Sequence, residues 1–232
     1  MPANAPLVAG VYVTGTDTGV GKSIASVALV HALRDHGGRA VGMKPVASGC
    51  GRVDGAWRNE DALALQAASD PLPDYDDVNP YALPEATAPE IAAHRAGVVL
   101  ALDRIEAGYR RLAAQADTVV VEGVGGWAAP LSAQLDQLDV VRALDLPVVL
   151  VVGLRLGCIS HARLTARAIA ADGVRLLGWI GNEVDPGLAE RDEYFALLQP
   201  RLPVPCLGRL PYLPGPTPAA PAGLLDLTPL RR

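Results

Sequence analysis

The sequence predicts an α/β fold, namely a doubly wound, mostly parallel sheet with helices on both faces. Six short apolar runs are continuous rather than alternating, which is typical of strands that are covered on both faces. Segments with helical spacing of apolar residues lie between these runs, and strands that alternate with helices form parallel sheets. Half of the 232 residues are hydrophobic, so the chain can bury a sizeable core.

The expected helix over residues 23–36 shows the helical pattern clearly. Apolar residues recur at spacings of three from Ile24 to Leu33, and Gly37 stops the pattern. The other elements are assigned in the same way. The expected strands cover residues 7–14, 39–46, 118–123, 146–153, 176–184 and 206–213, and the further helices cover residues 59–68, 99–115, 135–144, 158–171 and 188–198.

Two segments are less regular. Residues 47–98 are rich in Asp, Pro and Gly, and we expect one short helix plus loops attached to the core. Residues 214–232 are rich in Pro and Gly, and we expect a loosely structured tail. Because no internal repeat is present, we expect a single domain over residues 1–232.

Composition narrows the function classes. The net charge is −5 and no basic run is present, which argues against a nucleic-acid-binding protein. Three scattered cysteines favour a reducing compartment. The N-terminus lacks the basic region of a signal peptide, and no apolar run approaches the roughly 18 residues of a membrane helix. We therefore expect a soluble cytoplasmic protein without a nucleic-acid or membrane partner.

The stretch "TGTDTGVGKS", residues 14–23, joins the first expected strand to the first expected helix. Glycines after a parallel strand allow positive φ and let backbone N–H groups approach an anion. The following helix points its N-terminal N–H groups at the same place. Lys22 adds a charge for the β- and γ-phosphates, and the Ser23 hydroxyl can bind Mg²⁺. The stretch therefore predicts a phosphate loop that binds a nucleoside triphosphate.

The spacing of this loop leaves an alternative open. Gly15 and Gly21 are separated by five residues, whereas the standard phosphate loop has four. A glycine turn before a helix that happens to contain Gly-Lys-Ser is the other interpretation. The strand before the loop and the helix after it favour phosphate binding.

Lys44 lies near the end of the second expected strand, and it is one of only two lysines in the sequence. A compact ammonium can follow a moving phosphoryl group better than a planar guanidinium. A solvated surface lysine is the alternative. Position and scarcity favour a functional role at the edge of the sheet where the phosphate loop lies.

Three further polar residues are candidates. Glu122 ends the run "TVVVEG", where phosphate-loop enzymes keep an acid linked to Mg²⁺, although a helix-capping acid is the alternative. Asp61 fits a helix N-terminal turn equally well. Asn182 follows a strand, and its amide could pair with an adenine edge, but a turn asparagine is the simpler interpretation. The four histidines form no cluster typical of a transition-metal site, and no Ser or Cys triad is evident.

Together these segments resemble the dethiobiotin synthetase family over nearly the whole chain. The longer glycine loop is that family's own form. The motifs that carry the resemblance, in the family's order and spacing, are "GTDTGVGKS", "KPVASG", "NEDALALQ", "VNPY", "VEGVGGWAAPL", "LPVVLVVGLRLGCISHARLTA" and "GWIGNEVDP".

The resemblance implies a homodimeric, ATP-dependent ligase of the phosphate-loop NTPase type. Such an enzyme carboxylates 7,8-diaminopelargonate with CO₂ and phosphorylates the resulting carbamate with ATP. Attack by the second amine then closes the ureido ring of dethiobiotin and releases ADP and phosphate. Phosphoryl transfer of this kind needs positioning and charge neutralisation rather than a protein nucleophile.

The resemblance also implies a role for each matching residue. Lys22 and Lys44 would steady the transferred phosphoryl group, and Ser23, Asp61 and Glu122 would hold Mg²⁺. ATP would contact the metal-binding residues and also Gly19, Val20, Gly21, Lys22, Ile24, Gly123, Val124, Gly125, Asn182, Glu183, Pro211, Tyr212 and Leu213. The amine substrate would contact Thr18, Ser48 and, across the dimer interface, Gly157, Cys158, Ile159, Ser160 and Tyr194.

The chain departs from the family at two positions, and two other functions compete. Gly19 stands where Glu is familiar and Ser160 where Asn is familiar, which affects side-chain contacts there but not backbone contacts. A partitioning-type ATPase is the alternative function, but such proteins carry a lysine early in the loop, and no lysine precedes Lys22. A cobyrinate-type amidotransferase would need a glutaminase domain, for which no room remains.

Overall fold

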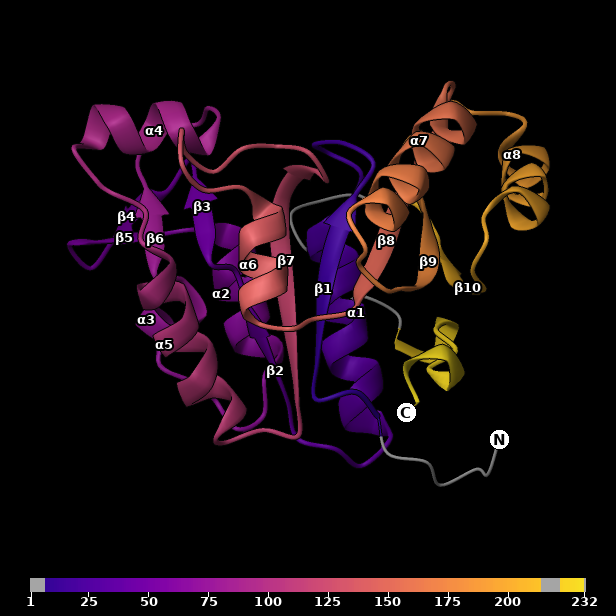
Figure 1. Ribbon diagram of the computed structural model, residues 1–232. Helices are drawn as coiled ribbons and strands as arrows, with labels where there is room; N and C mark the ends of the chain where they lie inside the picture. Colours follow the sequence, from indigo (N-terminus) through magenta and orange to yellow (C-terminus); the bar gives the residue numbers. More distant parts are fainter. Residues whose placement is uncertain (1–6, 214–221, 232) are drawn as a thin grey trace.

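The computed structural model describes residues 7–213 and 222–231. Within these residues, the centre of the molecule is a six-stranded sheet in the order β10-β9-β8-β1-β7-β2, and all neighbouring strands are parallel (Figure 1). The predicted α/β fold with a doubly wound parallel sheet is confirmed. The strands are β1 (Gly10–Gly15), β2 (Ala40–Met43), β7 (Thr118–Gly126), β8 (Val148–Leu154), β9 (Leu176–Glu183) and β10 (Cys206–Leu210).

Each of the six predicted helices is present, with ends within three residues of the expected ones. Apolar side chains explain their positions, because the helices cover both faces of a sheet whose strands are almost wholly buried. These helices are α1 (Lys22–Asp35), α2 (Glu60–Ala68), α5 (Leu102–Ala113), α6 (Gln137–Ala143), α7 (Cys158–Ala171) and α8 (Arg191–Leu198).

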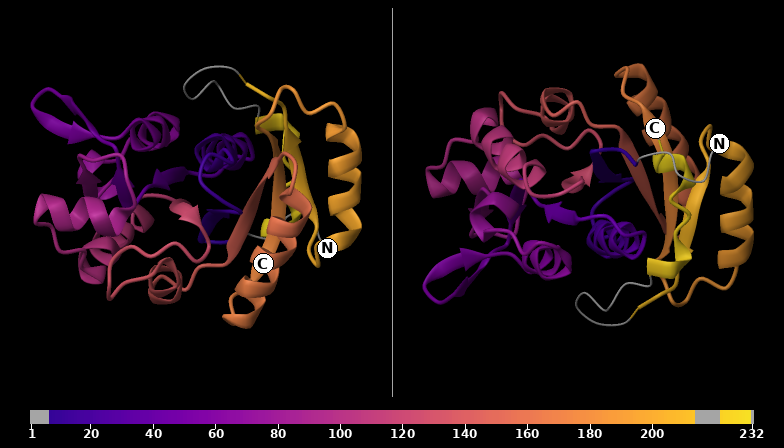
Figure 2. Two further views of the ribbon diagram at one scale, coloured as in Figure 1. Left: turned by 90° about the horizontal axis from the view of Figure 1, so that it is seen from above. Right: turned by 90° about the horizontal axis from the view of Figure 1, so that it is seen from below.

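The layers are clear when the molecule is seen from above (Figure 2). Helices α1 and α2 lie on one face of the sheet, and α5, α6 and α7 lie on the other. The main core forms around β1, β2, β7 and α1, and a second cluster forms around β8, β9, α7 and α8. Because β7 and β8 flank β1 on opposite sides, the loop after β1 lies where an α/β sheet normally binds its ligand.

The expectation of one short helix plus loops over residues 47–98 is wrong. Besides α2, this segment contains a two-stranded parallel pair, an antiparallel hairpin and two more helices. The hairpin turns at Asp54 and Gly55, whose φ angles of 50° and 81° suit the tight turn that an Asp-Gly pair favours. The added elements are β3 (Val46–Ser48), β4 (Gly51–Val53), β5 (Ala56–Arg58), α3 (Tyr75–Val78), β6 (Tyr81–Leu83) and α4 (Pro89–Ala96).

The expectation of a loosely structured tail is also wrong for residues 222–231, while residues 214–221 and 232 lie outside the described part of the chain. Leu225, Leu227 and Leu230 are buried in the main core, which fixes this segment against α1 and β10. The segment contains two short 3₁₀ helices: η2 (Ala222–Leu224) precedes the first of these leucines, and η3 (Thr228–Leu230) ends with the last. A third 3₁₀ helix, η1 (Gln199–Arg201), follows α8.

Within residues 7–213 and 222–231, no helix is both long enough and apolar enough to cross a bilayer.

Candidate functional site

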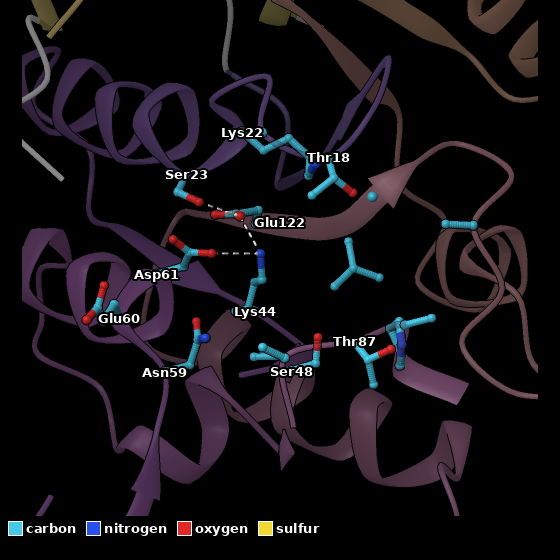
Figure 3. A pocket seen from close by; sticks show the side chains of 18 of the residues that line it. Thr18, Lys22, Ser23, Lys44, Ser48, Asn59, Glu60, Asp61, Thr87 and Glu122 are labelled. Carbon is cyan, nitrogen blue, oxygen red and sulfur yellow. Dashed lines mark hydrogen bonds and ion pairs between the residues drawn. The ribbon is translucent and has the colours of Figure 1, made fainter. Parts of the chain in front are cut away.

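A cavity of about 800 Å³ lies between the phosphate loop, the ends of β2 and β7, and the start of α4. Figure 3 shows side chains from these elements pointing toward one another across the cavity. Of the residues predicted to form the site, those that line it are Thr18, Gly19, Gly21, Lys22, Ser23, Ile24, Lys44, Ser48, Asp61, Glu122, Val124 and Gly125. The ends of several separate strands and helices therefore meet here, as expected for a parallel sheet.

The phosphate loop is shaped by its glycines. Gly19 and Gly21 have φ angles of 73° and 83°, which side-chain-bearing residues rarely adopt. Gly21 also packs closely, because a Cβ atom added there would lie 1.9 Å from Nδ2 of Asn182. The first turn of α1 has no side-chain cap, so its N–H groups can bind an anion instead.

Both lysines of the sequence are buried at this cavity. Lys22 is 7 % exposed, and its ammonium donates a hydrogen bond to the backbone carbonyl of Asp17 at 3.0 Å. Burial lowers the pKa of Lys22 to about 8, and the nearby charge of Lys44 adds to this effect. The carboxylates of Glu122, Asp61 and Asp17 act in the opposite direction, and an anion in the cavity would add to their effect and favour the charged form of Lys22.

Lys44 is 5 % exposed and is held by two carboxylates. Its Nζ lies 2.5 Å from Oε1 of Glu122 and 3.3 Å from Oδ2 of Asp61, and it also donates to the carbonyl of Gly123. Burial opposes the charged form of Lys44, but the two carboxylates outweigh burial and hold its pKa above the ordinary value. The alternative interpretation, a solvated surface lysine, is wrong.

The acidic residues fit a magnesium ion. Glu122 is completely buried, and the Ser23 hydroxyl donates to its Oε1 at 2.9 Å, whereas its Oε2 has no hydrogen-bond partner. Asp61 completes a set of one hydroxyl and two carboxylates around the cavity wall. Mg²⁺ is usually bound by one or two carboxylates plus phosphate oxygens, so this donor set suits it. No group of three or more His, Cys, Asp or Glu side chains suited to a metal is found in the described residues.

Other predicted residues lie beside the cavity rather than on its wall. Val20 belongs to the phosphate loop and its side chain is buried, and the carbonyl of Gly123 accepts a hydrogen bond from Lys44. Asn182 is only 1 % exposed, and its Nδ2 donates to the carbonyl of Val20 at 3.1 Å. This bond uses one of the two hydrogens of Nδ2, and the buried Oδ1 has no partner, so the pairing with adenine stays a prediction.

The remaining residues predicted to contact the nucleotide lie at the end of β9 and after β10. Glu183 forms ion pairs with Arg191 and Arg209, which reduces its freedom to contact a ligand. Because β9 and β10 are neighbouring parallel strands, the segment 211–213 after β10 lies at the same edge of the sheet as Asn182. Tyr212 in this segment is 41 % exposed and therefore accessible.

The segment predicted to contact the substrate across the dimer interface does not line this cavity. Gly157, with a φ angle of 90°, precedes α7, so residues 158–160 form the first turn of that helix. Tyr194 lies half-buried on α8. An ion pair between Arg155 and Asp17, 2.5 Å long, connects the loop before α7 to the phosphate loop.

Sequence reasoning missed one wall of the cavity. Residues 86–89, at the start of α4, face the phosphate loop from the opposite side, and Figure 3 shows Thr87 near Ser48. The sequence does indicate a helix start here, because Pro89 occupies the first turn of α4. Nothing in the sequence pattern indicates that this start faces the cavity. The other lining residues that were missed are Ala47, Asn59, Glu60, Ala129 and Pro130.

Comparison with known proteins finds relatives that carry the same name. A family model described as an AAA domain matches residues 9–220. An ATP-dependent dethiobiotin synthetase BioD from Xanthomonas euvesicatoria pv. vesicatoria is 64 % identical over 93 % of this chain and 96 % of its own length. A protein of the same name from Xylella fastidiosa is 64 % identical over 88 % of this chain and 90 % of its own length.

Solved structures show more distant relatives. The MinC:MinD cell division protein complex of Aquifex aeolicus contains a chain with a TM-score of 0.53 at 12 % identity, covering 89 % of this chain and 83 % of that one. The signal recognition particle receptor FtsY of Elizabethkingia anophelis, in complex with GDP, has a TM-score of 0.50 at 15 % identity, covering 99 % and 64 %. At these identities the likeness shows the fold alone, an α/β fold around a parallel sheet.

Proposed function

The chain belongs to the ATP-dependent dethiobiotin synthetase family, and from this premise we propose that it closes the ureido ring of dethiobiotin. Enzymes of this kind are ATP-dependent ligases that form C–N bonds. The substrates would be 7,8-diaminopelargonate, CO₂ and ATP. The observation that carries the proposal is the convergence of Lys22 and Lys44 on one cavity beside a phosphate loop.

The reaction would proceed in three steps. One amine adds to CO₂ and loses a proton, which gives a carbamate. A carbamate oxygen attacks the γ-phosphorus of ATP, and ADP leaves. The second amine attacks the carbamoyl carbon of this mixed anhydride, loses a proton and expels phosphate, so that two C–N bonds have formed in all. Because a carbamate is short-lived, a closed site that holds it against the γ-phosphate provides the necessary proximity.

Charge neutralisation would come from the two lysines. The ammonium of Lys22 lies within the phosphate loop and would contact the β- and γ-phosphates, where the anionic charge also favours its protonated form. Lys44 approaches from β2 and would contact the phosphoryl group as negative charge moves during transfer. One charge-stabilising contact of this type typically contributes about 10²–10³ in rate.

The metal site would consist of Ser23, Asp61 and Glu122. When bound, Mg²⁺ would neutralise part of the charge of the phosphates. Glu122 is already held by the Ser23 hydroxyl, so the metal-binding residues need little rearrangement. Lys44, which pairs with Glu122 and Asp61 in the structure, would then be available to the phosphoryl group.

Thr18 and Ser48 would contact the reacting end of the diamine, since both lie on the cavity wall near the two lysines. The adenine would lie beyond the phosphate loop, against Asn182 and residues 211–213. Among these, the unpartnered Oδ1 of Asn182 would accept a hydrogen bond from the adenine amino group.

The carboxylate end of the substrate would be bound by a second copy of the chain, at the start of α7. Leu156, in the turn before α7, and Leu164, on α7, are 80 % and 59 % exposed, and Leu164 shares a helix face with Ser160 because residues four apart lie on the same side. A helix start can bind an anion through its free N–H groups, and exposed leucines lie on both sides of this one. These features suit a dimer interface at which the site of the partner uses the start of α7. Tyr194 would contribute to the same subsite.

A partitioning-type ATPase remains the competing function for this fold. It is not favoured, because no lysine precedes Lys22 in the loop. Phosphate release from ATP distinguishes the two proposals when diamine and bicarbonate are omitted in turn. We expect release only with both present. Vigorous hydrolysis that ignores the diamine would contradict the synthetase function.

A further inference from the structure

The loop after β7 forms one wall of the cavity. Val124 and Gly125 line the cavity near the phosphate loop, and Ala129 and Pro130 line it farther along. A Cβ atom added at Gly125 would lie 3.6 Å from the hydroxyl oxygen of Thr18, so this wall lies directly beside the phosphate loop. The position of its backbone therefore decides how closely the wall approaches a bound phosphoryl group.

A buried side chain from α6, Gln137, makes several of the contacts that hold this loop, and the indole N–H of Trp127, which donates to Oδ2 of Asp172 at 2.7 Å, makes another. Its Oε1 accepts hydrogen bonds from the backbone N–H of Val124 at 2.9 Å and from the hydroxyl of Tyr12 at 2.8 Å. Its Nε2 donates to the carbonyls of Gly126 at 2.6 Å and Ala129 at 3.3 Å. The amide thus uses both of its acceptor positions and both of its donor hydrogens.

The side chain of Gln137 is also closely packed. Gln137 is 0 % exposed and Tyr12 is 2 % exposed. A Cβ atom at position 123 would lie 2.4 Å from Oε1 of Gln137 and 2.5 Å from the Tyr12 hydroxyl, so Gly123 is what lets the amide approach the strand. Gln137 does not line the cavity, and it carries no charge that could act on a ligand directly.

We propose that Gln137 is a positioning residue for phosphoryl transfer, which acts by fixing the loop of residues 124–130 against the phosphate loop. This inference rests on the proposed function of the cavity. Loss of the amide would leave the N–H of Val124 and the carbonyl of Ala129, both partly buried, without this partner, and the loop would move to recover the hydrogen bonds. A misplacement of about 1 Å near reacting groups can cost about 10²-fold in rate.

The expected kinetic effect falls on turnover rather than on nucleotide binding. ATP would be held mainly by the phosphate loop and the start of α1, which Gln137 does not contact. We therefore expect Gln137→Met to lower kcat about 10- to 100-fold and to leave the KM for ATP within about threefold. Gln137→Glu should behave similarly, because its carboxyl group has at most one O–H to donate, when protonated, and so cannot bind the carbonyls of Gly126 and Ala129 together.

Tyr12→Phe is the matched control. It removes a hydrogen bond from the same buried network but leaves the bonds between Gln137 and the loop in place. A merely structural role would lower kcat to a similar extent in all three variants. Positioning of the loop predicts a near-normal kcat for Tyr12→Phe and a large loss for both Gln137 variants.

Hydrogen–deuterium exchange of residues 123–131, measured without substrates, tests the loop independently of activity. We expect faster exchange there in both Gln137 variants and unchanged exchange in α1. If the wild-type protein makes no dethiobiotin, the proposed function fails while the exchange result still tests the hold on the loop. A folded Gln137 variant with wild-type kcat, or with unchanged exchange in this segment, would overturn the inference, and Gln137→Glu decides it if Gln137→Met does not fold.

Discussion

Replacement of Lys44 by methionine should destabilise the metal-free protein as well as slow the reaction. The ammonium of Lys44 is the cation nearest to Glu122, whose side chain is completely buried. After the change, Glu122 would retain the Ser23 hydroxyl on Oε1, and its Oε2 has no partner even in the wild type. Water cannot replace the missing charge, because the carboxylate is not accessible to solvent.

The expected loss follows from this burial. Removal of one partner from a buried ion pair costs about 3–5 kcal/mol, whereas an exposed pair contributes about 0–1 kcal/mol. Asp61 adds little to the loss, because 38 % of its side chain is exposed and water can solvate it. We therefore expect the free energy of unfolding of Lys44→Met to fall by about 3–5 kcal/mol.

Urea denaturation in the presence of EDTA and without nucleotide measures this loss. The double variant Lys44→Met/Glu122→Gln is the control, since it removes the buried charge and should recover most of the stability but none of the activity. A loss below about 1 kcal/mol in Lys44→Met, or no recovery in the double variant, would refute the reasoning. Added Mg²⁺ should partly restore Lys44→Met, because the metal supplies a cation to Glu122.

Three further predictions concern other parts of the molecule. Gly21→Ala should weaken ATP binding at least about tenfold in calorimetry, because its Cβ would collide with Asn182 and a φ of 83° disfavours any side chain. The control Gly37→Ala places its Cβ in open space and should leave ATP binding unchanged. Leu230→Ala should lower the free energy of unfolding by about 2–5 kcal/mol in urea, since Leu230 is wholly buried; a change under about 0.5 kcal/mol would mean that residues 222–231 do not dock on the core. A mixture of Lys44→Met and Tyr194→Ala dimers should, after subunit exchange, recover about a quarter of wild-type activity per subunit, because one site of each mixed dimer collects both defects; no recovery despite demonstrated exchange would exclude a shared site.

The sequence predicted the central sheet and its six helices because their determinants are local. Continuous apolar runs mark strands that are buried on both faces, and a stripe such as that from Ile24 to Leu33 marks a covering helix. The convergence of Lys44 and Glu122 also followed from the sequence, since both residues lie near the carboxyl ends of expected strands that share one edge of the sheet. The 3.3 Å contact between Lys44 and Asp61 needed the structure, because Asp61 belongs to a helix whose docking is a tertiary property.

The features that escaped prediction depend on packing between distant segments. Composition suggested a loose C-terminal tail, but three leucines within residues 222–231 are enough to fix that part of it to the core. The hairpin at Asp54 and Gly55 did have a local determinant, the Asp-Gly pair, which the abundance of turn residues around it obscured. Gln137 resembles any helical glutamine in the sequence, and only its burial beneath the loop after β7 reveals a role.

Transfer of oxygen from bicarbonate to phosphate tests the central claim most directly. In the proposed reaction a carbamate oxygen that came from CO₂ attacks the γ-phosphorus and stays with the phosphate when the ring closes. With ¹⁸O-labelled bicarbonate, diamine and ATP, sampled before the label exchanges with water, each phosphate released should carry one oxygen from bicarbonate. Unlabelled phosphate, released while the remaining bicarbonate still holds its label, would contradict the account.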